Sequence, residues 1–310
     1  MDLSAISLTL LAASLMVAST PILLAAIGEL VAEKAGVLNL GVEGMMIIGA
    51  ICGFAAAVVT GSPMIGFLCA ALGGAALSLI FAVLTQYFLS NQVATGLALT
   101  LFGLGLSAML GQSYIGIKPP ASAKLDLPLI SDIPVLGPIL FSHDFTVYAA
   151  IALVAGVWWF LKYTRGGLIL RAVGESHEAA HALGYKVVWV RILAIMFGGA
   201  CAGLGGAALS LVRVPQWTEG MTAGSGWIAL AIVVFASWKP ARVLLGAYLF
   251  GGVAVLQLNL QAAGVSIPVE YLSMSPYLIT IIVLVAMSAN RSKSALNAPA
   301  ALGRVFHASR

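Results

Sequence analysis

The sequence is poor in charged residues. Asp, Glu, Lys and Arg make up only 8% of its 310 residues, whereas 61% are hydrophobic, and the mean hydropathy is +1.06. A soluble globular protein of this composition would expose more apolar surface than water tolerates, so that class is excluded. The lipid bilayer is therefore the expected solvent, and each crossing needs about 20 mostly apolar residues in a helix that satisfies its own backbone.

Short segments of alternating hydrophobicity, which are typical of membrane β-barrels, are also lacking. The apolar runs are long instead, and they predict an all-α, polytopic helical membrane protein with about nine transmembrane helices, within a range of eight to ten. We expect one transmembrane domain over residues 1–310. The expected spans are residues 3–27, 45–60, 63–89, 93–111, 145–161, 191–212, 225–237, 243–262 and 273–289.

Two kinds of chemical site are missing from the sequence. The three cysteines, Cys52, Cys69 and Cys201, stand in apolar runs without partners at metal-ligand spacing, so they predict packing and no metal site. No G-x-x-x-x-G-K-[ST] motif occurs, so the chain cannot cradle a nucleoside triphosphate as a P-loop ATPase does. If ATP drives this protein, a partner chain must bind it, and no catalytic residue is expected here.

The basic residues are distributed unevenly between the two sides of the expected membrane. Twelve Lys and Arg residues fall on one side, mostly in the 162–190 loop and the 290–310 tail, and three fall on the other. Because positive charge accumulates in cytoplasmic loops, the loop and the tail are expected in the cytoplasm, and the Pro-rich loop 112–143 outside. Orientation explains these charges, so no nucleic-acid partner is expected.

The stretch Gly28–Gly44 is too polar for lipid although apolar runs flank it. It includes Glu29, Glu33, Asn39 and Glu43. Irregular backbone at membrane depth survives only where protein or a watery cavity surrounds it, so this stretch predicts a broken or re-entrant segment that faces the bundle interior.

The cytoplasmic loop contains a short segment bounded by Gly174 and Gly184 and rich in helix formers. It predicts a short helix outside the membrane, either a docking helix for a motor protein or a solvated amphipathic connector. The same segment contains His177-Glu178-x-x-His181, a literal H-E-x-x-H, which could hold zinc in a membrane metalloprotease. A third ligand is lacking because His143 is expected across the membrane, so the zinc site remains a remote alternative.

Four stretches, in order along most of the chain, resemble the permeases of ribose-type and branched-chain amino acid ABC importers, and most closely the branch that takes up nucleosides. The resemblance implies a second, similar permease, a cytoplasmic ABC ATPase, an external solute-binding lipoprotein and a place in the bacterial inner membrane. It implies no cofactor in this chain, since the partner subunit binds ATP. The four stretches are Gly28–Met45, Thr164–Gly184, Gly220–Pro240 and Ser275–Leu278.

The resemblance also implies that the short cytoplasmic segment is a coupling helix, which is expected to insert into the ATPase. Its coupling residues are expected to be Arg171, Gly174, Glu175, Glu178, Ala179, Ala180 and Gly184. For a path that replaces water around a small polar solute without holding it tightly, the candidate lining residues are Asn39, Glu43, Asn91, Gln92, Thr95 and Trp227. Each polar candidate could instead form a hydrogen bond between helices.

The nature of the solute follows from the resemblance alone. A nucleoside is the expected solute, with a simple sugar of the ribose type or a branched-chain amino acid as alternatives. Nothing physical in these residues distinguishes the three.

Overall fold

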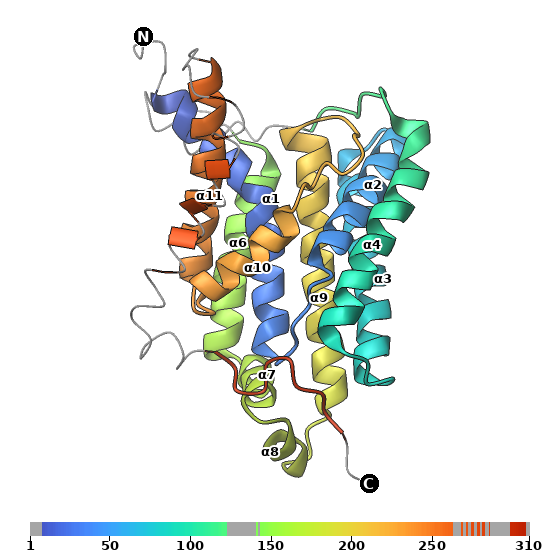
Figure 1. The fold of residues 1–310 in the computed structure, drawn as a ribbon, viewed down its shortest axis with the longest axis vertical. Coiled ribbons are helices and arrows are strands. Elements are labelled where there is room, and N and C mark those ends of the chain that lie inside the picture. The colour runs from blue at the N-terminus through green and yellow to red at the C-terminus, as the bar shows by residue number, and fades with distance from the viewer. Residues whose placement is uncertain are drawn as a thin grey trace.

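A computed structural model describes residues 8–122, 141, 143–262 and 298–307, together with isolated residues between 268 and 285. Helices account for most of these residues (Figure 1). The elements are α1 (Leu8–Lys34), α2 (Val42–Thr60), α3 (Pro63–Gln86), α4 (Gln92–Gly111), the 3₁₀ turn η2 (Gln112–Tyr114), α6 (Phe145–Tyr163), α7 (Arg165–Glu175), α8 (His177–Ala182), α9 (Val187–Ala207), its π-helical extension η3 (Ala208–Arg213), α10 (Ser225–Phe235) and α11 (Pro240–Ala262).

The all-helical membrane fold is confirmed. Seven helices of the described part are long and apolar enough to cross a membrane, and each corresponds to an expected span. They are α1, α2, α3, α4 with η2, α6, α9 with η3, and α11. The expected total of about nine is not confirmed, because the span at 273–289 lies largely outside the described residues.

The expected span at 225–237 is wrong. The structure gives an 11-residue helix there, α10, and at 1.5 Å per residue it is about 17 Å long, against about 30 Å of hydrocarbon. Figure 1 shows α10 crossing α1 obliquely near the middle height of the bundle. Its apolar composition reflects burial within the bundle and not a full crossing.

The polar stretch Gly28–Gly44 does not form a separate broken segment. Its first seven residues continue α1 without interruption to Lys34, and Val42 already begins α2. Only residues 35–41, here called the α1–α2 link, are non-helical. The expected burial is correct, since Glu29, Glu33 and Asn39 are fully buried, and the link returns from the lower end of α1 into the bundle (Figure 1).

Helix α9 packs at the centre against α1, α2 and α3. Small residues allow this packing, because a side chain at Gly49 would collide with the backbone of Gly203, and one at Gly206 with the carbonyl oxygen of Met46. Lipid tails provide no hydrophobic drive between helices, so such close backbone contact is what holds a membrane bundle together.

The lower end of the bundle in Figure 1 gathers segments that are far apart in sequence. The end of α1, the pair α7 and α8, and the tail segment 298–307 all lie there. Most of the external loop 112–143 lies outside the described residues, as do residues 290–297 and 308–310 of the tail.

Candidate functional site

The side chain of Glu43, at the start of α2, meets the start of α10 inside the bundle. Its carboxylate oxygens accept hydrogen bonds from the Thr222 hydroxyl (2.5 Å), the Gly224 N–H (2.9 Å) and the Gly226 N–H (2.7 Å). Gly224 is the N-cap residue of α10 and offers no side-chain cap of its own. Glu43 therefore caps a helix from another part of the chain, and its charge faces the positive ends of two helix dipoles.

The turn before α10 has a backbone suited to this contact. Gly220, Ala223 and Gly224 all have positive φ, at 65°, 44° and 82°. A non-glycine residue in this region costs about 1–2 kcal/mol, so the turn at Ala223 persists because the surrounding contacts hold it. Gly226 lies so close to the Glu43 backbone that any side chain there would collide with it.

Two further carboxylates lie one helical turn apart on α1. Glu29 accepts a hydrogen bond from the Asn39 N–H at 3.3 Å, and Glu33 accepts one from the indole N–H of Trp238. Both carboxyl groups are fully buried, and each keeps one oxygen without a hydrogen-bond partner among the described residues. They hold the α1–α2 link and the α10–α11 turn, respectively, against α1.

The six candidates for the solute path do not form one cluster. Asn39 is fully buried and its side chain accepts the Gly41 N–H, so it shapes the link. Asn91 is exposed and caps α4 by accepting the Ala94 N–H.

The other α4 candidates also have partners within the chain. Gln92 is buried, accepts the Leu38 N–H and donates to the Arg304 carbonyl. Thr95 shares a hydrogen bond with Ser90. Trp227, by contrast, is 46% exposed at the start of α10, beside the residues that Glu43 caps.

The expected coupling segment consists of two helices. Gly174 lies near the end of α7 and does not start a helix, and α8 follows after Ser176, whose hydroxyl caps it. Of the expected coupling residues, Arg171, Glu175, Glu178, Ala179 and Gly184 are exposed.

Gly174 and Ala180 are buried against other parts of this chain. Gly174 packs against the carbonyl of Lys34, and Ala180, 2% exposed, packs in a small apolar cluster with Val173, Val187 and Phe306. The expectation that Ala180 faces a partner does not fit this burial.

The tail segment binds across the same end of the molecule. The buried Arg191 donates from Nη2 to the carbonyls of Gly36 (2.7 Å) and Arg304 (2.9 Å). The Ala301 N–H donates to Gly174 O, and the Gly303 N–H donates to Gly36 O. The tail thereby joins α7, the α1–α2 link and α9.

The two histidines of the H-E-x-x-H motif pack against a phenyl ring. The His177 and His181 rings lie 5.9 and 5.4 Å from the ring of Phe306. The described residues contain no group of three or more potential metal ligands. Burial, with Arg191 and Arg304 nearby, lowers the pKa of His177 to about 4, so this imidazole is neutral near pH 7 and fills an apolar cluster.

Sequence reasoning missed the roles of four buried residues, Glu29, Glu33, Trp238 and Arg191. A signal was available for Arg191 and Glu29, since a charge within or beside a long apolar run predicts a buried partner. No signal identified their hydrogen-bond partners, because a local sequence pattern contains no information about which backbone carbonyl groups or which distant indole will lie nearby.

Comparison with known proteins gives this arrangement a family context. Residues 11–287 match the family described as branched-chain amino acid transport system, permease component. The chain is 42% identical to the putative glucose ABC transporter permease protein TsgC13 of Haloferax volcanii, over 86% of this chain and 88% of that protein.

Two relatives are named for nucleosides. The chain is 34% identical to the guanosine ABC transporter permease protein NupQ of Bacillus subtilis, over 89% of this chain and 91% of that protein. It is 33% identical to the nucleoside ABC transporter permease protein NupC of Lactococcus lactis, over 90% of this chain and 92% of that protein.

Proposed function

The chain belongs to the family of permease components of branched-chain amino acid transport systems, and from this membership we propose that it is the permease subunit of an ATP-driven importer for nucleosides. The observation that carries the proposal is that the family match covers nearly the whole chain, with relatives named as ABC transporter permeases. The whole chain acts as one multi-pass permease domain in the plasma membrane.

A cytoplasmic ABC ATPase binds the exposed surface of α7 and α8. This coupling face consists of Arg171, Glu175, Glu178, Ala179, Leu183 and Gly184, all exposed in the isolated chain. Leu183 is 75% exposed, and an apolar side chain amid charged neighbours is the composition expected at the centre of an interface. This assignment places the lower end of Figure 1, with the tail, in the cytoplasm.

A second, similar permease closes the solute path. At Glu43 the side toward α10 is closed to solute, since Gly226 packs directly on the Glu43 backbone and the carboxylate already accepts three hydrogen bonds. The path therefore runs along the surface that presents Trp227 and the exposed residues Gln216, Thr218 and Glu219 of the preceding loop. One bundle leaves this surface open, so the path lies between two permeases, and an external binding lipoprotein delivers solute to it.

Nucleosides suit this surface because an exposed indole can stack on a base, and base–aromatic stacking stabilises such complexes by about 1–3 kcal/mol. The second candidate solute is a hexose, favoured by the 42% identity to a putative glucose permease. Trp227→Ala helps to distinguish the two solutes, because it removes the stacking surface that the base requires and should therefore reduce nucleoside uptake.

Uptake into membrane vesicles that carry the complete complex tests the proposal. We expect ATP-dependent uptake of labelled guanosine, with little uptake of glucose, ribose or leucine. Glucose or ribose uptake without guanosine uptake would replace the nucleoside assignment by a sugar. Uptake by this subunit alone, without any ATPase, would contradict the importer itself.

The coupling face has its own test with a matched control. Leu183→Asp places a charge on the coupling face. Ile115→Asp changes a similarly exposed apolar side chain (64% exposed) that follows α4 and η2, at the end of α4 opposite to Gln92 and the tail. We expect the ATPase to copurify with the Ile115 variant and to be lost from the Leu183 variant. Equal copurification would show that α8 is only a connector.

A further inference from the structure

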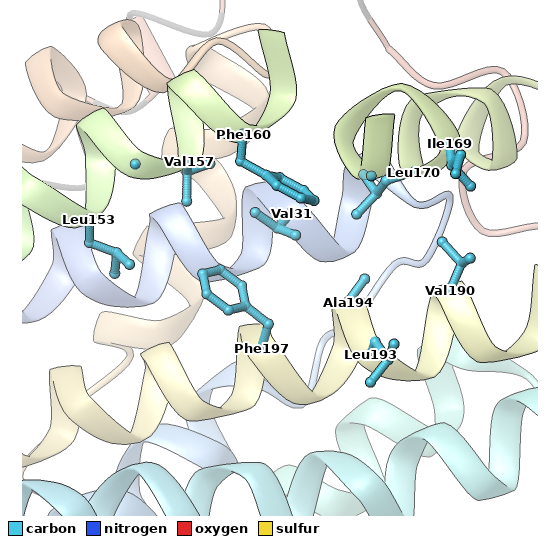
Figure 2. Close-up of a pocket in the computed structure, with 12 residues that line it drawn as sticks. Val31, Leu153, Val157, Phe160, Ile169, Leu170, Val190, Leu193, Ala194 and Phe197 are labelled. Atoms are coloured by element: carbon cyan, nitrogen blue, oxygen red, sulfur yellow. The ribbon is translucent and has the colours of Figure 1, made fainter. Parts of the chain in front are cut away.

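An apolar groove of about 470 Å³ lies between α6, α7 and α9. Figure 2 shows its walls: Leu153, Val157 and Phe160 project from α6, and Val190 to Phe197 from α9, with Val31 of α1 as the floor. Ile169 and Leu170 of α7 close one end. No residue that lines the groove has a polar side chain.

The composition of the groove indicates the chemical class of its occupant. Its volume falls within the roughly 300–1,000 Å³ of small-molecule pockets, but such pockets carry a few polar groups that orient the ligand. This groove has none, so a nucleoside or a sugar would lose its hydrogen bonds there without replacement. Hydrocarbon is the occupant that fits.

The groove opens at the outer surface of the bundle. Gly156 and Leu193, which line it, are exposed. Leu193 is 62% exposed. A side chain added at Gly156 would meet no atom within 4 Å. A transmembrane helix of a partner is a poor occupant, because α7 lies across one end and would stop it from continuing along the groove.

The closed end of the groove carries positive charge. Arg165 begins α7 immediately before Gly166, a lining residue, and is exposed. Lys186, also exposed, is the N-cap residue of α9, one turn before the lining residue Val190. Basic residues at the end of an apolar groove between membrane helices match the charge of an anionic lipid headgroup.

We propose that this groove binds an anionic phospholipid, with an acyl chain between α6 and α9 and its phosphate beside Arg165 and Lys186. The lipid would lie against α7, which also carries the exposed coupling-face residues Arg171 and Glu175. Lipid binding is a property of the purified protein and does not depend on the transported solute, so this site can fail while the proposed function stands.

Native mass spectrometry of the purified complex in defined lipid tests the acyl-chain part. Gly156→Leu fills the groove with a side chain that fits sterically, and Gly105→Leu is the matched control, because Gly105 is likewise exposed with nothing within 4 Å, but on α4. We expect the Gly156 variant to lose most of the retained phosphatidylglycerol and the Gly105 variant to keep it. Equal retention in both variants would overturn the proposal, as would loss of the partner permease in place of lipid.

The headgroup part is tested by Arg165→Gln, with Arg242→Gln as a control at another exposed arginine. One basic side chain near an anionic surface accounts for about a five-fold difference in affinity. We expect Arg165→Gln to weaken retention of phosphatidylglycerol by about that factor and to leave retention of phosphatidylcholine unchanged. Equal retention of the two lipids by the unmodified protein would overturn the assignment of an anionic headgroup.

Discussion

Glu43 offers the sharpest test of how the bundle interior is held. The change Glu43→Ala removes the acceptor for three donors at once, the Thr222 hydroxyl and the N–H groups of Gly224 and Gly226. All three donors face a site where Glu43 is only 3% exposed, so water replaces the lost oxygens poorly. A buried donor left without a partner costs about 1–3 kcal/mol.

The expected loss is therefore substantial. Three donors would set an upper limit near 9 kcal/mol, and partial relaxation should reduce it to about 3–5 kcal/mol, the range for breaking a buried charged contact. At roughly 2 °C per kcal/mol, the melting temperature of the complex in lipid nanodiscs should fall by about 6–10 °C. Glu43→Gln keeps one oxygen acceptor but turns an amide NH₂ toward an N–H, so it should lose about half as much.

Glu219→Ala is the control, because Glu219 is an exposed glutamate in the loop that precedes α10. We expect its melting temperature to equal that of the unmodified protein. A Glu43→Ala variant that melts at the unmodified temperature and still transports guanosine would refute the capping role. A Glu43→Gln variant identical to the unmodified protein would show that shape matters there and charge does not.

Four further outcomes are expected. Arg191→Gln should destabilise the complex by about 3 kcal/mol, because two backbone carbonyls lose a charged donor, and limited proteolysis should then cleave the tail faster. His177, with its pKa lowered to about 4 from 6.5, stabilises the fold fully above pH 6.5 and progressively less toward pH 4, so the melting temperature should fall over that window and His177→Phe should remove this part of the pH dependence. His181→Ala should leave transport near normal and elemental analysis should find no stoichiometric zinc. Trp238→Phe should cost about 1.5–3 kcal/mol, measured by thermal melting, because Glu33 loses its indole donor.

The long helices could be predicted because their information is local. An apolar run of about 20 residues specifies a membrane helix whatever its neighbours, and seven such runs were placed correctly. The error at α10 has a physical reason, since an apolar run of about a dozen residues is equally consistent with a short buried helix. The distant Glu43, which caps α10 from α2, helps to determine where that helix starts, and the apolar run carries no information about it.

The candidate residues show the same contrast between local information, which the sequence pattern contains, and distant contacts, which it does not. Polarity alone was enough to place Glu43 and Asn39 inside the bundle, and both are buried. It could not reveal that each already has partners within the chain, because those partners are backbone groups far away or in a tight turn. The exposed Trp227 keeps its place as a candidate on the solute path, while Gln92 acts as a connector between α4, the link and the tail.

The α1–α2 link lies between the pair α7 and α8 and the start of α10. At one end, Gly36 packs against Gly174 and the imidazole of His177, and its carbonyl accepts from Arg191. Seven residues later, Glu43 caps α10. Because packed interiors move between discrete arrangements and do not deform continuously, we expect a shift of α7 and α8 to displace the link as a unit. Such a displacement would reach Glu43 and, through its cap, the segment that presents Trp227.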